Sequence, residues 1–222
     1  MPQIAVEGRA VRFQRAERGT LTVVVSFSGE AREPVLERAR RTHARLVDEA
    51  KAHTDAGTAT WWGADGVAAW AYHEWIKPQP HLDSQKVLRF RATSRVRVKF
   101  RDFSVLSTWA SAVAERTGVS IDGVEWALTD ATRIALTQEV RRSAALDARA
   151  RAAEYATALG LGEVRLVTLY EAGLRPDVGS RPGPTTVSTR GASASSSNGS
   201  GFELRPDDIE VTAAVTADYE TA

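Results

Sequence analysis

The stretch that decides the fold is TDATRIALTQEVRRSAALDARARAAEYATALG, residues 129–160. Its interior is rich in alanine, arginine and leucine, which are strong helix formers. Thr129 and Asp130 provide side-chain acceptors for the free backbone N–H groups at the start, and Gly160 stands where a glycine commonly ends a helix. We therefore expect one long helix over residues 129–159.

Strand-forming segments lie on both sides of this helix. Residues 119–128 precede it, residues 163–170 follow it, and residues 208–219 alternate apolar and polar side chains. The clearest alternation is KVLRFRATSRVRVKF, residues 86–100, which places apolar groups on one face and cations on the other. These segments predict a sheet on which the alanines of the long helix can lie closely.

Two more helices and two hairpins complete the pattern. Apolar residues recur at helical spacing over residues 33–56 and 104–117. Glycine-containing turns favour hairpins over residues 4–28 and over residues 58–77. The fold class we expect is α+β, with a curved antiparallel β-sheet packed against two to three long helices.

Length and composition allow one large domain or two small ones. The chain has 222 residues, of which 43% are hydrophobic, enough to bury a core. We expect a single domain over residues 1–222, with two subdomains, 1–82 and 83–222, as a further division. Residues 172–203 are rich in glycine, serine and proline and predict a flexible loop between two strands.

Charge and cysteine content exclude several classes of protein. The 29 Lys and Arg residues nearly balance 28 Asp and Glu residues, so the net charge of +1 gives no overall attraction to nucleic acid or anionic membranes. The lack of cysteine rules out disulfides, thiolate metal sites and cysteine nucleophiles. No segment approaches the roughly 18 apolar residues that span a bilayer, and the first residues lack a secretory signal pattern. We expect a cytoplasmic protein without membrane insertion.

Motifs for catalysis are missing from the sequence. It contains no Gly-x-Ser-x-Gly elbow, no phosphate-binding loop and no Gly-x-Gly-x-x-Gly fingerprint. His43 and His53 are ten residues apart, which is not the spacing of a metal pair on a helix. His73 and His81 each have a carboxylate nearby and offer the one conceivable metal site. We expect no catalytic residues, no metal and no cofactor.

Five large aromatic side chains form a candidate interface or ligand surface. In a strand, Trp70 and Tyr72 lie on one face and Trp75 on the other. Exposed aromatic patches mark protein contacts more often than catalysis, so a core or subunit interface is our first interpretation. The wall of a small-molecule pocket is the alternative. The five residues are Trp61, Trp62, Trp70, Tyr72 and Trp75.

Two charged surfaces are further candidates. Asp147, Arg151 and Tyr155 are spaced by four residues and share one face of the long helix. This charged helix stripe either lines a binding groove or forms solvated ion pairs. The row of cations in residues 86–101 favours nucleic-acid binding as a third function, although such a row also suits the exposed face of a soluble sheet.

Residues 124–130, VEWALTD, and residues 141–160 carry a resemblance to the SIMPL domain family of uncharacterised bacterial proteins. Members are similar in a helix that repeats Ala, Asp-Ala and Arg-Ala before a Leu-Gly stop. Residues 204–211, LRPDDIEV, support the likeness, whereas residues 8–10 depart from the Gly-x-Gly that members usually show.

The resemblance implies a function without catalysis. The family has no established enzymatic activity, is associated with oxidative-stress defence, and includes ring- or channel-like homo-oligomers. From the resemblance we expect a structural or interaction protein that forms a homo-oligomer.

Overall fold

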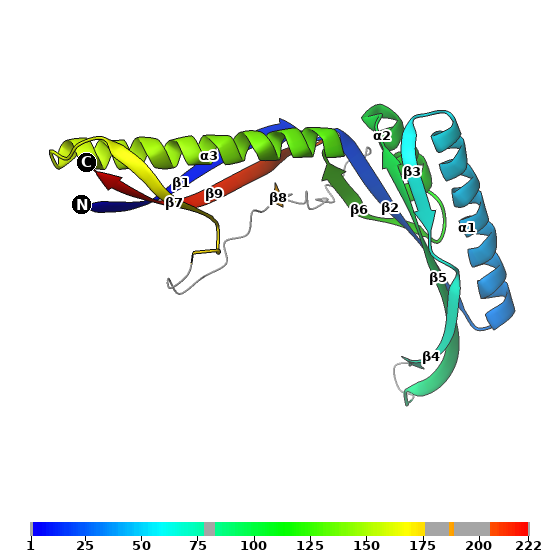
Figure 1. Ribbon diagram of the computed structural model, residues 1–222. Helices are drawn as coiled ribbons and strands as arrows, with labels where there is room; N and C mark the ends of the chain where they lie inside the picture. The colour runs from blue at the N-terminus through cyan, green and yellow to red at the C-terminus, as the bar shows by residue number, and fades with distance from the viewer. Residues whose placement is uncertain (1, 78–82, 176–186, 189–204, 222) are drawn as a thin grey trace. The chain divides into compact units, whose positions relative to one another are not determined.

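The computed structural model describes residues 2–77, 83–175, 187–188 and 205–221. It contains helices and two antiparallel sheets, which confirms the α+β prediction (Figure 1). The chain divides into two compact units. Unit 1 comprises residues 1–16, 128–190 and 207–222, and unit 2 comprises residues 17–127 and 191–206.

The sheet of unit 1 is built around its last strand. β9 (Asp208–Thr221) pairs with β1 (Gln3–Arg15) along one edge and with β7 (Val164–Glu171) and β8 (Val187–Ser188) along the other. Alternate β9 side chains from Ile209 to Thr221 are buried. The period of two places all of these buried side chains on one face of the sheet.

The long helix α3 (Asp130–Ala158) covers this face and confirms the prediction for residues 129–159. The Thr129 hydroxyl accepts the N–H of Thr132 at the start, and Gly160 follows the end with a φ of +67°. The helix buries a row of small side chains against the sheet, which are Val140, Ala144, Ala148, Ala152 and Ala156.

Gly8 of β1 makes this close packing possible. A Cβ atom at this position would lie 2.5 Å from the backbone nitrogen of Ala148 and 2.7 Å from its Cβ, and would also meet the carbonyl oxygen of Ala144. Only a residue without a side chain lets the backbone of α3 approach β1 so closely.

The sheet of unit 2 has the strand order β3 (Ala59–Ala64), β5 (Gln85–Phe100), β2 (Arg18–Gly29) and β6 (Val119–Ala127), and β4 (Ala68–Ile76) also pairs with β5. Helices α1 (Arg32–Asp55) and α2 (Phe103–Ala114) share one hydrophobic core with it. Asp102 begins α2 by accepting the backbone N–H groups of Ser104 and Val105. The core side chains include Leu21, Val23, Leu46, Val98, Phe100 and Leu106.

Both predicted hairpins are wrong. β1 and β2 (Arg18–Gly29) belong to different sheets, because β2 pairs with β5 (Gln85–Phe100) and β6 (Val119–Ala127). The two residues between β1 and β2 therefore carry the chain from one sheet to the other and close no hairpin turn.

In the second predicted hairpin, β3 (Ala59–Ala64) and β4 (Ala68–Ile76) each pair with β5 in the antiparallel sense. They run in the same direction along one edge of β5, at its two ends. Residues 65–67 therefore join the two strands without reversing the chain.

The chain passes from one compact unit to the other after residues 16 and 127, and the predicted division after residue 82 falls within unit 2. Most of the predicted loop 172–203 lies outside the described residues, which include a turn at 172–175 and the short strand β8. Within the described parts of the chain, no helix has the length and apolar character required to cross a membrane.

Candidate functional site

Two of the four histidines have hydrogen-bond partners within unit 2. His43 Nδ1 lies 3.0 Å from the hydroxyl of Ser94, and His53 Nδ1 lies 3.3 Å from that of Thr58. Burial lowers the pKa of both imidazoles. His73 is exposed on β4, and His81 lies outside the described residues. The described ranges contain no cluster of three metal-ligating side chains.

A polar cluster around Glu49 fixes α1 to α2. The Glu49 carboxylate accepts a hydrogen bond of 2.9 Å from Trp109 Nε1 and another of 2.9 Å from Arg116. Burial by itself raises the pKa of Glu49, but the two hydrogen bonds and the charges of Arg116 and Arg45 together outweigh it and leave the pKa lowered. His53 stacks edge-on against Trp109 at 5.5 Å. The cluster is satisfied internally and acts as a structural link between helices.

The predicted aromatic surface lies along the β3, β4 and β5 strands of unit 2. Trp62 pairs with Val98 and packs on the core, whereas Trp61 is half exposed opposite Lys99. Trp70 and Tyr72 oppose Arg91 and Arg89 on one face of the β4–β5 pair. Trp75 opposes Lys86 on the other face and is 67% exposed. The structure therefore distributes the five side chains over a core and two exposed faces.

β4 and the first part of β5 form a ribbon, which we call the β4–β5 arm (residues 68–76 and 85–93), and its outer part extends beyond the main sheet as two strands. β2 pairs with β5 only as far as Phe90, so residues 85–89 pair with β4 alone. Figure 1 shows the arm curving away from α1 within unit 2. Its exposed apolar side chains are Trp70, Trp75 and Leu88.

The basic row of β5 is largely neutralised. Arg89 pairs with Glu30 and Glu74, Arg95 with Asp122, and Arg97 with Asp65. Two further cations lie over aromatic rings, Arg91 over Tyr72 at 5.1 Å and Lys99 over Trp61 at 5.9 Å. Cations engaged in this way are less available to phosphate groups, which weighs against the nucleic-acid interpretation.

The charged helix stripe connects α3 to β1. Asp147 pairs with Arg151 at 2.8 Å and accepts the backbone N–H of Arg9 at 2.9 Å. The Arg9 hydrogen bond, opposed by burial and aided by Arg151, lowers the pKa of Asp147. Tyr155 is exposed one turn further along the helix. Asp147 and Arg151 thus come together, and Asp147 satisfies a backbone donor of an edge strand.

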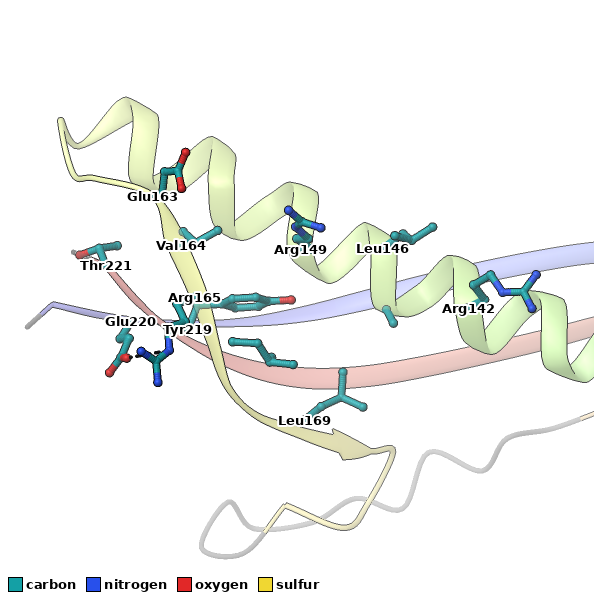
Figure 2. Close-up of a pocket in the computed structure, with 12 residues that line it drawn as sticks. Arg142, Leu146, Arg149, Glu163, Val164, Arg165, Leu169, Tyr219, Glu220 and Thr221 are labelled. Atoms are coloured by element: carbon teal, nitrogen blue, oxygen red, sulfur yellow. Dashed lines mark ion pairs between the residues drawn. The ribbon is translucent and has the colours of Figure 1, made fainter.

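A groove of about 800 Å³ opens in unit 1 between α3 and strands β7 and β9 (Figure 2). Helix α3 packs mainly over β1 and β9, and so leaves part of the sheet beside β7 uncovered. This groove was not among the surfaces predicted from the sequence. The signal that was present is the apolar content of residues 164–170, where both faces of one strand carry large apolar side chains. The lining includes Arg142, Leu146, Arg149, Leu166, Leu169 and Tyr219.

Fold and surfaces together define an α+β protein of two units whose exposed features are an aromatic arm and an apolar groove. The chain belongs to the SIMPL family, described as "Protein of unknown function (DUF541)", whose profile matches residues 4–219. This confirms the family resemblance seen in the sequence.

Comparison with other known proteins adds little to the family assignment. No curated protein matches the chain. Among solved structures it is similar to a "putative amidohydrolase/peptidase" from Burkholderia cenocepacia, with 17% identity and a TM-score of 0.21. The match covers 63% of this chain and 33% of that protein, so this chain spans about a third of its length. A likeness this weak carries no argument about fold or activity.

Proposed function

We propose that this protein is a non-enzymatic interaction protein that assembles into a closed homo-oligomer through its β4–β5 arm. The observation that carries the proposal is the arm itself. A two-stranded ribbon is marginally stable in water. Its free edges carry unpaired backbone groups, and these groups and the exposed aromatic side chains can bind another chain. Burial of Trp70 and Trp75 between subunits would supply the apolar contact that the arm lacks in a single chain.

A second copy of the same chain is the occupant that fits the arm best. Charges on the arm are balanced within the chain, since Arg89 pairs with Glu74, so two copies of the arm can approach without net repulsion. The ring- or channel-like relatives implied by the family resemblance support the same proposal. A role in oxidative-stress defence and a cytoplasmic location belong to the proposal as well. With no cysteine in the chain, such a role would not use thiol chemistry of its own.

A single introduced cysteine tests whether arms meet. Lys86 lies opposite Trp75 on the exposed face of the arm, and the native chain contains no competing thiol. We expect Lys86→Cys to form a covalent dimer under mild oxidation. Asp48→Cys, on the exposed side of α1, is the matched control and should remain monomeric in a denaturing gel. Equal cross-linking of the two variants, or none in either, would contradict assembly through the arm.

The aromatic surface as a small-molecule wall remains the alternative proposal. A flat ligand could stack on Tyr72 as Arg91 does. Arg91 already covers this ring, so a ligand would have to displace it. Quenching of tryptophan fluorescence by a planar hydrophobic compound, abolished by Trp70→Ser, would favour it over self-assembly.

A further inference from the structure

The groove of unit 1 has an apolar floor that no other part of the described chain covers. Leu166 and Leu169 of β7 pair with Tyr219 and Ala217 of β9, which places them on the sheet face that α3 packs against. Together with Leu146 of α3 they are between 42% and 59% exposed, whereas the β9 residues of this face are buried. Such a surface favours contact with an apolar group of a ligand.

Two arginines of α3 border this floor. Arg142 and Arg149 lie on the same side of the helix as Leu146 and are about 10 Å apart along its axis, at about 1.5 Å per residue. Neither has an ion-pair partner within the described residues. Arg133, Arg141 and Arg151 of the same helix, in contrast, are paired with Asp130, Glu171 and Asp147. The groove therefore concentrates positive charge that the protein itself does not neutralise.

Tyr219 lines the groove, and no hydrogen bond joins its hydroxyl to another described residue. Tyr219 is only 3% exposed, and Figure 2 shows its ring extending from β9 into the space below α3. Burial raises the pKa of Tyr219, and the charge of Arg149 opposes this shift, so the two groups act on each other. The hydroxyl is therefore free to donate a hydrogen bond to an acceptor bound in the groove.

The remaining charged groups of the groove determine at which end an anionic group can bind. Arg165 pairs with Glu220 at 3.5 Å, so these two charges offset each other. Glu163 lies at the opposite end of the groove from Arg142 in Figure 2. An anionic group is thereby repelled from the Glu163 end and attracted to the part of α3 that carries the two free arginines.

We propose that this groove binds an amphipathic carboxylate, a medium-chain hydrocarbon with a single anionic head. The carboxylate accepts hydrogen bonds from the Arg149 guanidinium and the Tyr219 hydroxyl, and Arg142 adds positive charge. The hydrocarbon chain lies on Leu146, Leu166 and Leu169. The volume of about 800 Å³ falls within the range of small-molecule sites, which are mostly apolar with a few convergent polar groups. This site lies in unit 1 and is independent of the β4–β5 arm.

Displacement of a dansyl-labelled undecanoate from the full chain tests the proposal. Dodecanoate should displace the probe, whereas dodecyltrimethylammonium, with the same hydrocarbon and the opposite charge, should not. Arg149→Gln and Tyr219→Phe should each weaken dodecanoate binding about tenfold, as expected for the loss of one hydrogen bond to a charged group. Leu146→Glu should remove binding, because it places a carboxylate on the apolar floor.

Arg141→Gln is the matched control, with the same change of charge on the same helix but at an arginine that is paired with Glu171 and does not line the groove. It should leave the affinity unchanged. Equal displacement by the cationic amphiphile, or equal affinity in Arg149→Gln and Arg141→Gln, would overturn the proposal. The head-group comparison uses the unmodified protein, so it decides the question even if a variant folds poorly.

Discussion

The backbone N–H of Arg9 in β1 donates a hydrogen bond of 2.9 Å to the Asp147 carboxylate in α3. β1 is an edge strand, and among the described residues its outward N–H groups have no neighbouring strand to accept them. The Asp147 side chain thus accepts the hydrogen bond that a neighbouring strand would otherwise accept. The contact lies next to Gly8, where the helix backbone comes closest to the sheet.

Removal of this carboxylate should weaken unit 1 selectively. Asp147→Ala deletes the hydrogen bond to Arg9 and the ion pair with Arg151, and should lower the free energy of unfolding by about 1 kcal/mol. All six tryptophans belong to unit 2, so far-UV circular dichroism should report the loss while tryptophan fluorescence stays unchanged. Asp48→Asn, which breaks an exposed pair with Lys51, serves as the control and should have little effect.

The same contact should depend on pH in a defined direction. The folded pKa of Asp147 is lowered from its ordinary value of 3.8, mainly by the Arg9 hydrogen bond. The stabilisation is therefore complete above pH 3.8 and is lost as the pH falls through the lowered folded pKa. In urea titrations the difference between the native protein and Asp147→Ala should shrink toward zero in acid. A difference that stays constant with pH would show that the charge of Asp147 is unimportant.

Because α3 packs closely on Gly8, we expect one added methyl group at this position to lower the stability of unit 1 strongly. Gly8→Ala forces a Cβ into the backbone of α3, where neither Ala144 nor Ala148 has a flexible side chain that can move aside. We expect a loss of about 3 kcal/mol in the stability of unit 1, in the range for overpacked cores. Gly66→Ala is the control, because a Cβ there meets no atom within 4 Å. Similar melting temperatures for the two variants would refute the packing of α3 on β1.

Glu49 should contribute to the free energy of unfolding of unit 2. Glu49→Ala leaves the Trp109 indole and the Arg116 guanidinium without their acceptor, and should cost about 2 kcal/mol, as for hydrogen bonds to a charged group. Tryptophan fluorescence should detect this change directly. Glu37→Ala, which removes an exposed ion pair with Arg41 on the same helix, should cost much less. If both variants unfolded at the same urea concentration, the Glu49 cluster would have no special role.

Protonation of two histidines should destabilise unit 2. Burial lowers the pKa of His43 and of His53 from 6.5, although Asp65 and Glu49 respectively oppose the shifts. The folded state then binds fewer protons than the unfolded state, so stability is highest above pH 6.5 and falls as the pH drops below that value. The double variant His43→Gln/His53→Gln should flatten this pH dependence. His73→Gln, on the exposed β4, should leave the slope as it is.

The sequence predicted the helices better than the strand pairings. The long helix was predicted over residues 129–159 and is observed over Asp130–Ala158, because capping and helix propensity are local properties. Alternation in residues 86–100 correctly indicated a strand with one buried face. Alternation specifies the face of a strand but not its neighbour. For this reason β1, whose partner β9 lies about 200 residues away in the chain, was assigned to a hairpin.

The groove could not be derived from the sequence for a similar reason. Leu166 and Leu169 look like ordinary core residues, and only the placement of α3 over β1 and β9 leaves them uncovered. In the sequence, Arg142 and Arg149 cannot be distinguished from the other arginines of α3. Only the structure shows that Arg133, Arg141 and Arg151 form ion pairs. The aromatic side chains of residues 61–75 were recognisable as a candidate surface, but not their division between a core and an arm.

Sedimentation of the purified chain tests assembly through the β4–β5 arm most directly. At micromolar concentration we expect a mass that is a multiple of 24.1 kDa, and a shift to 24.1 kDa in the double variant Trp70→Ser/Trp75→Ser. Leu159→Ser is the control, since Leu159 is 68% exposed but belongs to unit 1, and it should leave the native mass unchanged. A native protein that sediments as a single 24.1 kDa species would contradict the proposed assembly.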